Sequence, residues 1–300
     1  MTFTLANLWP FLLLVVVIGL AFAALALSRW WMERGRRHPF SADINRFPGQ
    51  SLGKRVDDIF ADITAHLAVL FMLPMLFYWS NQVGSQGVNP ALSALISLVG
   101  FLAGLAYLLT KLIRGFRQLR QYRLGMWGEM ATGQMLDLLM LEGHRVFHDL
   151  PADKFNIDHV VVTNSGVFAV ETKARRKPDK ARGKIDYSVE FDGRVLNFPD
   201  WTDAKTIQQA TRQADWLANW LRSATGDKVP VAAVVAIPGW YINRTGRSRV
   251  YVINPKQIGQ LIKGLGGEQL RPDLRRRVIH QLEQRCKYAP WHERELRESA

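Results

Sequence analysis

The sequence predicts a mixed α/β domain preceded by three membrane-spanning helices. Two observations concern the first third of the chain, where long stretches lack charged side chains and basic residues cluster at their ends. A third is the change after Gly143 from helical spacing of apolar residues to the short apolar runs typical of β-strands. With 300 residues the chain is long enough for about two domains, so a peptide or toxin is excluded.

The first third of the chain is apolar enough to span a bilayer. Residues 1–28 contain no Asp, Glu, Lys or Arg, and a second such stretch, 63–110, is interrupted by a polar, glycine-containing segment at 80–90. Since a helix needs roughly 20 apolar residues to cross the hydrocarbon core, the second stretch predicts a helical hairpin. Two alternatives stay open: a cleaved signal peptide for the first stretch and an apolar soluble helix pair for the second. The expected spans are 8–27, 63–79 and 91–112.

Basic residues flank these spans unevenly, and their distribution predicts an orientation. The connector between the first two spans carries seven Lys or Arg residues and the segment 111–123 carries five, whereas the loop at 80–90 carries none. By the positive-inside rule the N-terminus lies outside, and everything after the third span is cytoplasmic. We therefore expect a multi-pass protein of the cell inner membrane, with the lipid bilayer as one partner. The sequence leaves the oligomeric state open.

Charge and cysteine content limit the other partners. The chain has 39 Lys and Arg against 26 Asp and Glu, a net charge of +13 that favours a polyanionic partner such as nucleic acid or an anionic membrane face. The first 123 residues hold 12 basic and 5 acidic residues, so about half of the excess reflects membrane topology. A single cysteine, Cys286, excludes a disulfide within the chain and a cysteine-based zinc site, which leaves a metal to oxygen or histidine ligands.

Beyond Leu124 the pattern predicts the alternating elements of a soluble domain. An amphipathic helix over 126–141 ends at Gly143, and a second helix over 204–222 carries apolar residues at helical spacing. Strands are expected over 145–149, 157–163, 167–173, 188–191, 195–198, 229–237 and 249–253. The chain therefore divides into a membrane region (1–123), an α/β domain (124–240) and a strand with a basic helical extension (241–300).

Two neighbouring strands form a hairpin that carries charged residues at its end. The turn is expected at 164–166, and apolar residues on both faces place the hairpin in the centre of the sheet. Side chains two residues apart point the same way, so Glu171 and Lys173 share a face. An even-numbered turn with Asn164 opposite Val167 defines the register. It places Asp158 opposite Lys173 and diagonal to Glu171.

This arrangement suits a divalent cation. Two carboxylates a few ångströms apart repel each other unless a positive charge lies between them, and Mg²⁺ (or Mn²⁺) is the usual partner of oxygen ligands. Asp158 and Glu171 are therefore the candidate metal ligands. Lys173 would orient or help deprotonate an attacking water and offset the charge that develops on a phosphorane-like transition state. The alternative is a solvent-facing ion pair on an exposed strand.

Three sequence blocks follow one another along the chain: Gly125-Met126-Trp127-Gly128-Glu129, Ile157-Asp158-His159-Val160-Val161-Val162 and Gly166-Val167-Phe168-Ala169-Val170-Glu171-Thr172-Lys173. Together they resemble the nuclease-related domain, NERD, a branch of the restriction-endonuclease-like PD-(D/E)xK superfamily. The resemblance covers about 124–240. It implies an α-β-β-β-α-β core with a mixed sheet, Mg²⁺-dependent phosphodiester hydrolysis and a role in DNA processing. It also implies that Glu129 assists metal or water positioning, that Asp158 and Glu171 bind metal, and that Lys173 is the catalytic lysine.

The resemblance is incomplete in two places. The family tends to carry a glutamine preceded by Asn-Pro in the helix after the hairpin. Here Lys205-Thr206 stands in place of Asn-Pro, and Gln209 is the candidate catalytic glutamine, with Gln208 as the alternative. Ile157 replaces the proline of the superfamily name, at a position that carries no catalytic atom. Glu129 also has a structural interpretation, because acids are favoured at helix starts.

Other residues allow both a structural and a functional interpretation. His159 points away from Asp158 along the strand and is expected to be a packed or hydrogen-bonded histidine, not a ligand. The basic run 173–177 could bind phosphates or be a solvated loop. Trp201 could stack on a base, as could Trp216 and Trp220, whose helical spacing makes them core or interface residues first.

Two functions follow from these observations. The first is a membrane-anchored, Mg²⁺-dependent nuclease, a hydrolase that acts on DNA or RNA at the cytoplasmic side. The second is a catalytically inactive module that binds nucleic acid or serves as a scaffold tethered to the membrane. Salt-dependent binding without turnover would distinguish the second from the first.

Overall fold

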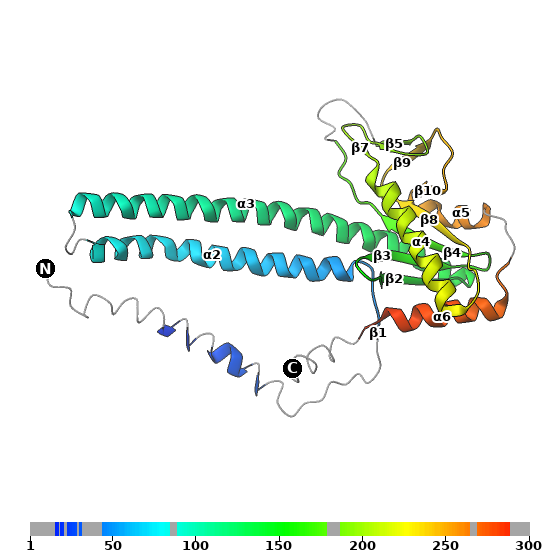
Figure 1. Cartoon of the computed structure of the whole chain (residues 1–300), viewed down its shortest axis with the longest axis horizontal. Coiled ribbons are helices and arrows are strands. Elements are labelled where there is room, and N and C mark those ends of the chain that lie inside the picture. The colour runs from blue at the N-terminus through cyan, green and yellow to red at the C-terminus, as the bar shows by residue number, and fades with distance from the viewer. Residues whose placement is uncertain are drawn as a thin grey trace. The chain divides into compact units, whose positions relative to one another are not determined.

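The computed structural model describes residues 44–84, 89–178, 187–264 and 269–288, together with helical residues within 16–31 (Figure 1). The first expected span, 8–27, therefore lies largely outside the described residues. The chain falls into two compact units. One contains residues 66–111, and the other contains residues 43–65 and 112–289.

Helices α2 (Gln50–Gly84) and α3 (Pro90–Asp137) are longer than the expected spans. Because α3 includes both the third span and the helix expected over 126–141, the prediction of a separate helix is wrong. The connecting segment 111–123 is rich in Leu, Arg and Gln, which are strong helix formers, and it contains no proline. The boundary expected at Leu124 thus falls inside α3, and the division of the chain into domains stays a prediction.

The apolar side chains of α2 and α3 are mostly exposed. The most apolar stretch of α2 has a mean hydropathy of 1.9 with 6% of it buried, and that of α3 has a mean hydropathy of 2.2 with 11% buried. The helices contact each other through Phe77 and Phe101, whose ring centroids are 5.0 Å apart, and through the hydroxyls of Ser80 and Ser97, 3.0 Å apart. Among the described residues there are thus two helices, not the expected three, that are long and apolar enough to cross a membrane.

A five-stranded mixed sheet forms the centre of the second unit, with the strand order β10-β8-β4-β3-β2. β2, β3 and β4 are antiparallel neighbours, whereas β8 runs parallel to both β4 and β10. The inner positions of β3 and β4 confirm the prediction from their apolar faces. The strands are β2 (Arg145–Pro151), β3 (Asn156–Val162), β4 (Val167–Thr172), β8 (Val231–Ala236) and β10 (Val250–Ile253).

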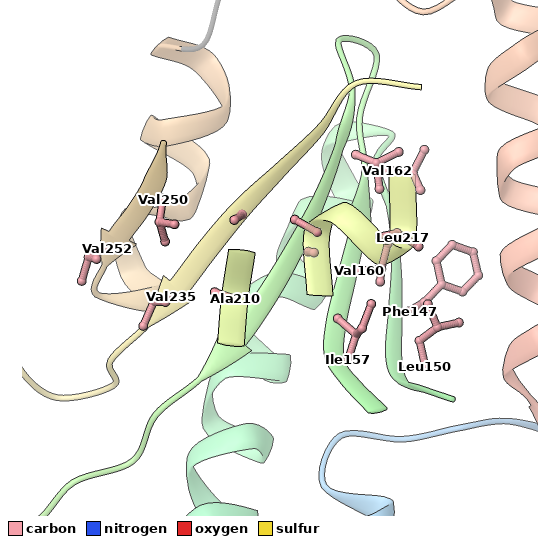
Figure 2. Packing of buried hydrophobic residues seen from close by; sticks show 14 of the residues in the cluster. Phe147, Leu150, Ile157, Val160, Val162, Ala210, Leu217, Val235, Val250 and Val252 are labelled. Carbon is pink, nitrogen blue, oxygen red and sulfur yellow. The ribbon is translucent and has the colours of Figure 1, made fainter. Parts of the chain in front are cut away.

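Helices cover both faces of this sheet. α4 (Lys205–Thr225) and α6 (Pro272–Cys286) pack on one face, and Figure 2 shows Leu217 of α4 beside Val160 and Val162 of β3. The other face is covered by the end of α3, the short helix η2 (Leu138–Glu142) and α5 (Ile258–Gly264). Burial on both faces explains why the central strands are apolar throughout, except at the end that carries Asp158 and Glu171.

The turn between β3 and β4 is longer than the sequence predicts. The last pair of the ladder is Val162 with Val167, so residues 163–166 form a four-residue turn. Thr163 stabilises this turn, because its hydroxyl oxygen accepts hydrogen bonds from the backbone N–H groups of Ser165 and Gly166, both at 3.1 Å. The Thr163 side chain therefore favours the longer turn. The alternation of apolar residues alone does not predict this length.

The longer turn shifts the register of the hairpin by two residues. His159 pairs with Val170, and extending this register brings Asp158 opposite Glu171. The prediction that Asp158 lies opposite Lys173 is therefore wrong. Because the shift is an even number of residues, the side chains keep the faces that the sequence predicts.

A second sheet, with the strand order β7-β6-β5-β9, is built largely from the segment between β4 and α4. The hairpin predicted around Asp192 is confirmed. The Asp192 carboxylate accepts hydrogen bonds from the N–H groups of Arg194 and Val195, both at 2.8 Å, and Gly193 has a positive φ of 97°. The strands are β5 (Ser188–Phe191), β6 (Leu196–Asn197), β7 (Thr202–Asp203) and β9 (Tyr241–Arg244).

A two-stranded ladder joins segments that are distant in sequence. β1 (Ile44–Asn45) pairs antiparallel with β11 (Lys287–Tyr288). Next to it the Arg46 N–H donates to the carbonyl oxygen of Cys286 at 3.1 Å. The residues that precede α2 are therefore part of the same compact unit as the main sheet.

Candidate active site

Asp158 lies where β3 separates from β4. The ladder between these strands ends at the pair of His159 and Val170, while β4 continues its parallel pairing with β8 through Thr172. The Asp158 carboxylate accepts a hydrogen bond from the backbone N–H of Thr172 at 2.6 Å. A side chain thus replaces the backbone partner at this point, and the carboxylate is fixed beside the end of β4.

Glu171 is buried near the end of β4. The Nζ atom of Lys173 lies 3.7 Å from its Oε1, so the two side chains share a face as strand geometry requires. The other oxygen, Oε2, accepts a hydrogen bond from Nε2 of Gln213 on α4 at 2.8 Å. The same Nε2 donates to the carbonyl oxygen of Asn156 at 3.3 Å, which ties α4 to the start of β3.

The glutamine that contacts Glu171 is not one that the sequence analysis identifies. Gln208 is exposed and Gln209 is half-buried, whereas Gln213 is buried. Gln213 follows Gln209 by one helical turn, so the two lie on the same side of α4. The signal that could have found Gln213 is a polar residue inside the apolar stripe of the helix.

Glu129 reaches the same cluster from α3, and the backbone of Gly49 beside its carboxylate acts to lower its pKa. The close approach of α3 depends on Gly128, since a Cβ atom at this position would lie 2.5 Å from the Cβ of Ala174. The neighbouring glycine therefore brings Glu129 close to the segment after β4. α3 begins far upstream at Pro90, so the alternative in which Glu129 complements the dipole at a helix start is wrong.

Three acids of this cluster have raised pKa values. Burial, and then the charges of neighbouring acids, raises the pKa of Glu129 to about 8. Burial, reinforced by Glu171 and Glu129, raises the pKa of Asp158 well above its ordinary value. Burial also raises the pKa of Glu171, although the charge of Lys173 opposes this. Ionisation of all three acids is therefore costly unless further positive charge is present.

Asp149 is a buried acid at the border of the cluster that sequence reasoning missed. Its φ of 50° lies in the left-handed region, which is uncommon for residues other than glycine. Its carboxylate accepts hydrogen bonds from Arg46 Nη1 at 2.9 Å, Ser51 Oγ at 2.7 Å and Asn156 Nδ2 at 3.0 Å. Two of these partners precede it by about a hundred residues, so no local spacing signals the contact.

Asp203 connects the cluster to the second sheet. Its two oxygens accept hydrogen bonds from the Thr206 N–H at 3.0 Å and the Thr206 hydroxyl at 2.7 Å, and Arg175 Nη2 lies 3.4 Å from Oδ2. Burial alone would raise the pKa of Asp203, but these hydrogen bonds and the charges of Lys173 and Arg175 hold it below its ordinary value. Asp203 is therefore an ionised acid with a cation of its own.

Acids outnumber bases at this site. With every group ionised, five acids and three bases leave two negative charges, which a hard divalent cation with oxygen ligands would balance. Asp158 and Glu171 would hold it. Within the described ranges, no three His, Cys, Asp or Glu side chains converge closely enough to hold a metal ion, so water and substrate oxygens would complete the ligand set. The acids are Glu129, Asp149, Asp158, Glu171 and Asp203, and the bases are Arg46, Lys173 and Arg175.

A second polar network lies on the other side of the hairpin. The Nδ1 atoms of His148 and His159 are 2.9 Å apart. The Nε2 of His148 lies 2.9 Å from Asp137 Oδ1, and the Nε2 of His159 lies 3.2 Å from Thr172 Oγ1. Burial lowers the pKa of His148 and lowers that of His159 well below its ordinary value. His159 is thus a hydrogen-bonded histidine that points away from Asp158, as the sequence predicts.

Comparison with known protein families identifies a nuclease-related domain (NERD) at residues 124–238. The match includes the end of α3, strands β2 to β4, α4 and β8. It therefore contains all five acids of the cluster, whereas Arg46, which pairs with Asp149, lies outside it. The match suggests a nuclease-related function. No curated protein and no solved structure matches the sequence.

Proposed function

We propose that this chain is a metal-dependent nuclease anchored in a membrane. The observation that carries the proposal is the group of carboxylates beside Lys173, at the end of the central hairpin, where five acids lie among three bases and the pKa values of three of the acids are raised. A cluster with strongly raised pKa values and a lysine is typical of catalytic sites. Its position inside the nuclease-related domain supports phosphodiester hydrolysis.

Five residues of the site have a chemical role in this proposal. Asp158 and Glu171 would hold Mg²⁺ (or Mn²⁺), which when bound lowers the pKa of a water molecule and polarises a phosphoryl oxygen. The ammonium group of Lys173 orients the attacking water and offsets negative charge in the transition state. Glu129, with a pKa of about 8, is mostly protonated near neutral pH, can exchange a proton there and positions the water. Gln213 holds the Glu171 carboxylate in place.

The remaining parts of the proposal concern the membrane spans, the placement in a superfamily and the substrate. Spans over 63–79 and 91–112 lie within helices of high hydropathy and low burial, and a further span is proposed over 8–27. The basic residues at their ends favour a cytoplasmic domain. The element order α3-β2-β3-β4-α4-β8 supports placement in the restriction-endonuclease-like superfamily. DNA is the proposed substrate, with RNA as the alternative.

One observation favours a second candidate function. Lys205-Thr206 stands where the family tends to carry Asn-Pro, and this departure would suit a module that binds nucleic acid without cleaving it. Such a module would show salt-dependent binding and no turnover.

Hydrolysis by the full chain in detergent tests the proposal. We expect Mg²⁺- or Mn²⁺-dependent cleavage of plasmid, linear duplex or single-stranded substrates, and a loss of at least about a hundredfold in the Lys173→Ala variant, because a transition-state charge partner is removed. The matched control is Lys256→Ala, at an exposed lysine outside the cluster. Intact substrates throughout, or equal rates for both variants and the wild type, would exclude the nuclease and favour the binding module.

A further inference from the structure

A groove lies between α2 and α3, within the compact unit that contains residues 66–111. Its volume is about 330 Å³. The hydroxyls of its two serines hydrogen-bond to each other at 3.0 Å, and the rest of its lining is apolar. We call it the α2–α3 groove and define it by Leu73, Phe77 and Ser80 of α2 with Ile96, Ser97 and Gly100 of α3.

Gly100 leaves the groove open on the side of α3. Among the described residues, no heavy atom would lie within 4 Å of a Cβ atom at Gly100, whereas a Cβ atom at Gly104 would lie 3.4 Å from Leu73 Cδ1. The side chain of α2 therefore covers Gly104 but not Gly100. Ile96, one turn before Gly100, is 63% exposed. The groove thus presents helix backbone and apolar side chains that a further apolar helix can cover.

The first expected span, 8–27, carries a surface that fits this groove. Gly19, Ala23 and Ala26 recur at intervals of four and three residues, so they share one side of a helix. All three are among the described helical residues, and their side of the helix is exposed. Small residues on one side allow two helix backbones to approach closely in a bilayer. The segment therefore offers a flat surface to the open backbone at Gly100.

The proposed topology brings the two surfaces to the same depth. With the N-terminus outside, spans 8–27 and 91–112 both run from the outer to the inner side, so they are parallel. Gly19 and Gly100 each follow the outer end of their span by about ten residues, and their depths differ by roughly 3 Å. The connector 28–62 joins the inner ends of the first two spans. It therefore keeps 8–27 at a high local concentration beside the groove.

From this match we infer that segment 8–27 docks in the α2–α3 groove and completes a bundle of three helices in the membrane. Gly19 packs against Gly100, and Ala23 extends the contact by one turn toward the inner side. A lipid acyl chain is the competing occupant. The covalent connector and the small-residue side of 8–27 favour the segment. The inference rests on the membrane spans of the proposed function and is independent of nuclease activity.

Disulfide formation in membrane vesicles that contain the full chain tests the docking. Val16 and Ile96 each lie one turn before the glycine of their own helix, on the same side. The pair Val16→Cys/Ile96→Cys is therefore expected to form a disulfide on mild oxidation, measured by mass spectrometry of the linked peptides. The control pair Val17→Cys/Ile96→Cys moves one thiol by about 100° around the helix and should give at least about tenfold less. Native Cys286 does not compete, because it is buried and its pKa is about 12.

A filled groove provides a second comparison. Gly100→Leu, added to the Val16→Cys/Ile96→Cys pair, places a side chain where the segment would pack and should lower the disulfide yield at least about tenfold. Ala106→Leu adds the same side chain on another side of α3, at an exposed residue, and should leave the yield unchanged. Equal yields for the two cysteine pairs, or a full yield with Gly100→Leu, would overturn the inference. A disulfide between two chains, seen as a dimer on a non-reducing gel, would also overturn it.

Labelling of the N-terminus separates this inference from the proposed function. In right-side-out vesicles a membrane-impermeant maleimide reaches Thr4→Cys when the N-terminus lies outside, whether or not the segment docks. Labelling without the disulfide would overturn the docking and leave the membrane anchor in place. The disulfide in a chain that hydrolyses no nucleic acid with Mg²⁺ or Mn²⁺ would support the docking and exclude the nuclease.

Discussion

Two buried polar clusters lie on opposite sides of the β3–β4 hairpin and differ in their charge balance. The histidine network runs from Asp137 through His148 and His159 to Thr172, and each member has a hydrogen-bond partner within it. The carboxylate cluster has more acids than bases, and burial raises the pKa of three of them. A satisfied network stabilises the fold by itself, whereas acids in excess of bases either stay protonated or take up positive charge from outside. The comparison therefore separates a cluster whose polar groups satisfy one another from one that we propose to bind a cation.

The largest effect that would test this contrast concerns Glu129. Its pKa is about 8 in the folded protein, above its ordinary value of 4.5, so the folded state holds this proton more tightly than the unfolded state. The resulting stabilisation is fully present below pH 4.5 and is lost as the pH rises to about 8. The loss is at most about 5 kcal/mol. Glu129→Gln keeps the shape without the charge and should remove this slope from the unfolding free energy, measured with urea across that pH range. An unchanged slope, equal to that of the exposed control Glu142→Gln, would contradict the assignment.

A smaller effect tests the histidine network. The pKa of His159 is lowered from its ordinary value of 6.5, so the neutral ring stabilises the folded state above that pH and this stabilisation is lost as the pH falls below it. The pH dependence is therefore opposite to that of Glu129. His159→Ala should lower the unfolding free energy by about 3 kcal/mol at neutral pH, since it leaves a cavity and polar partners without hydrogen bonds. The unfolding free energy of this variant should also decrease less steeply as the pH falls below 6.5. A change no larger than that of exposed His280→Ala would show that the network does not stabilise the fold.

The smallest effect distinguishes two glutamines on α4. Gln213→Ala should slow hydrolysis by about tenfold, because the variant loses the hydrogen bond that orients Glu171. Gln209→Ala, one turn earlier and half-buried, should change the rate by less than about twofold. The measurement is the cleavage rate at saturating Mg²⁺. A larger effect at Gln209 would instead support the assignment made from sequence.

Much of the fold follows from local patterns. Apolar runs and turn residues locate the central hairpin, the strands around Asp192 and the helix α4, because each depends on neighbours in sequence. The turn of the central hairpin is longer than the apolar alternation predicts, because the hydroxyl of Thr163 stabilises a four-residue turn. The end of α3 is not a separate helix, because the change in composition at residue 124 does not break helical hydrogen bonding.

Local sequence patterns predict only part of the candidate site. Glu171 and Lys173 are predictable neighbours because strand geometry fixes side chains two residues apart. Asp158 joins them because the observed register differs from the predicted one by two residues, an even number that changes its cross-strand partner but keeps its face. Asp149 and its partner Arg46 depend on a contact between segments about a hundred residues apart, which no spacing rule encodes.

Binding of Mn²⁺ to the full chain tests the central claim most directly. The account predicts a bound ion detectable by electron paramagnetic resonance, with affinity at least about tenfold lower in Asp158→Asn, because a ligand charge is removed. The exposed control Asp200→Asn should bind like the wild type. Equal Mn²⁺ binding by Asp158→Asn and the wild type, or no binding by either, would contradict the claim that the carboxylate cluster is a divalent-cation site.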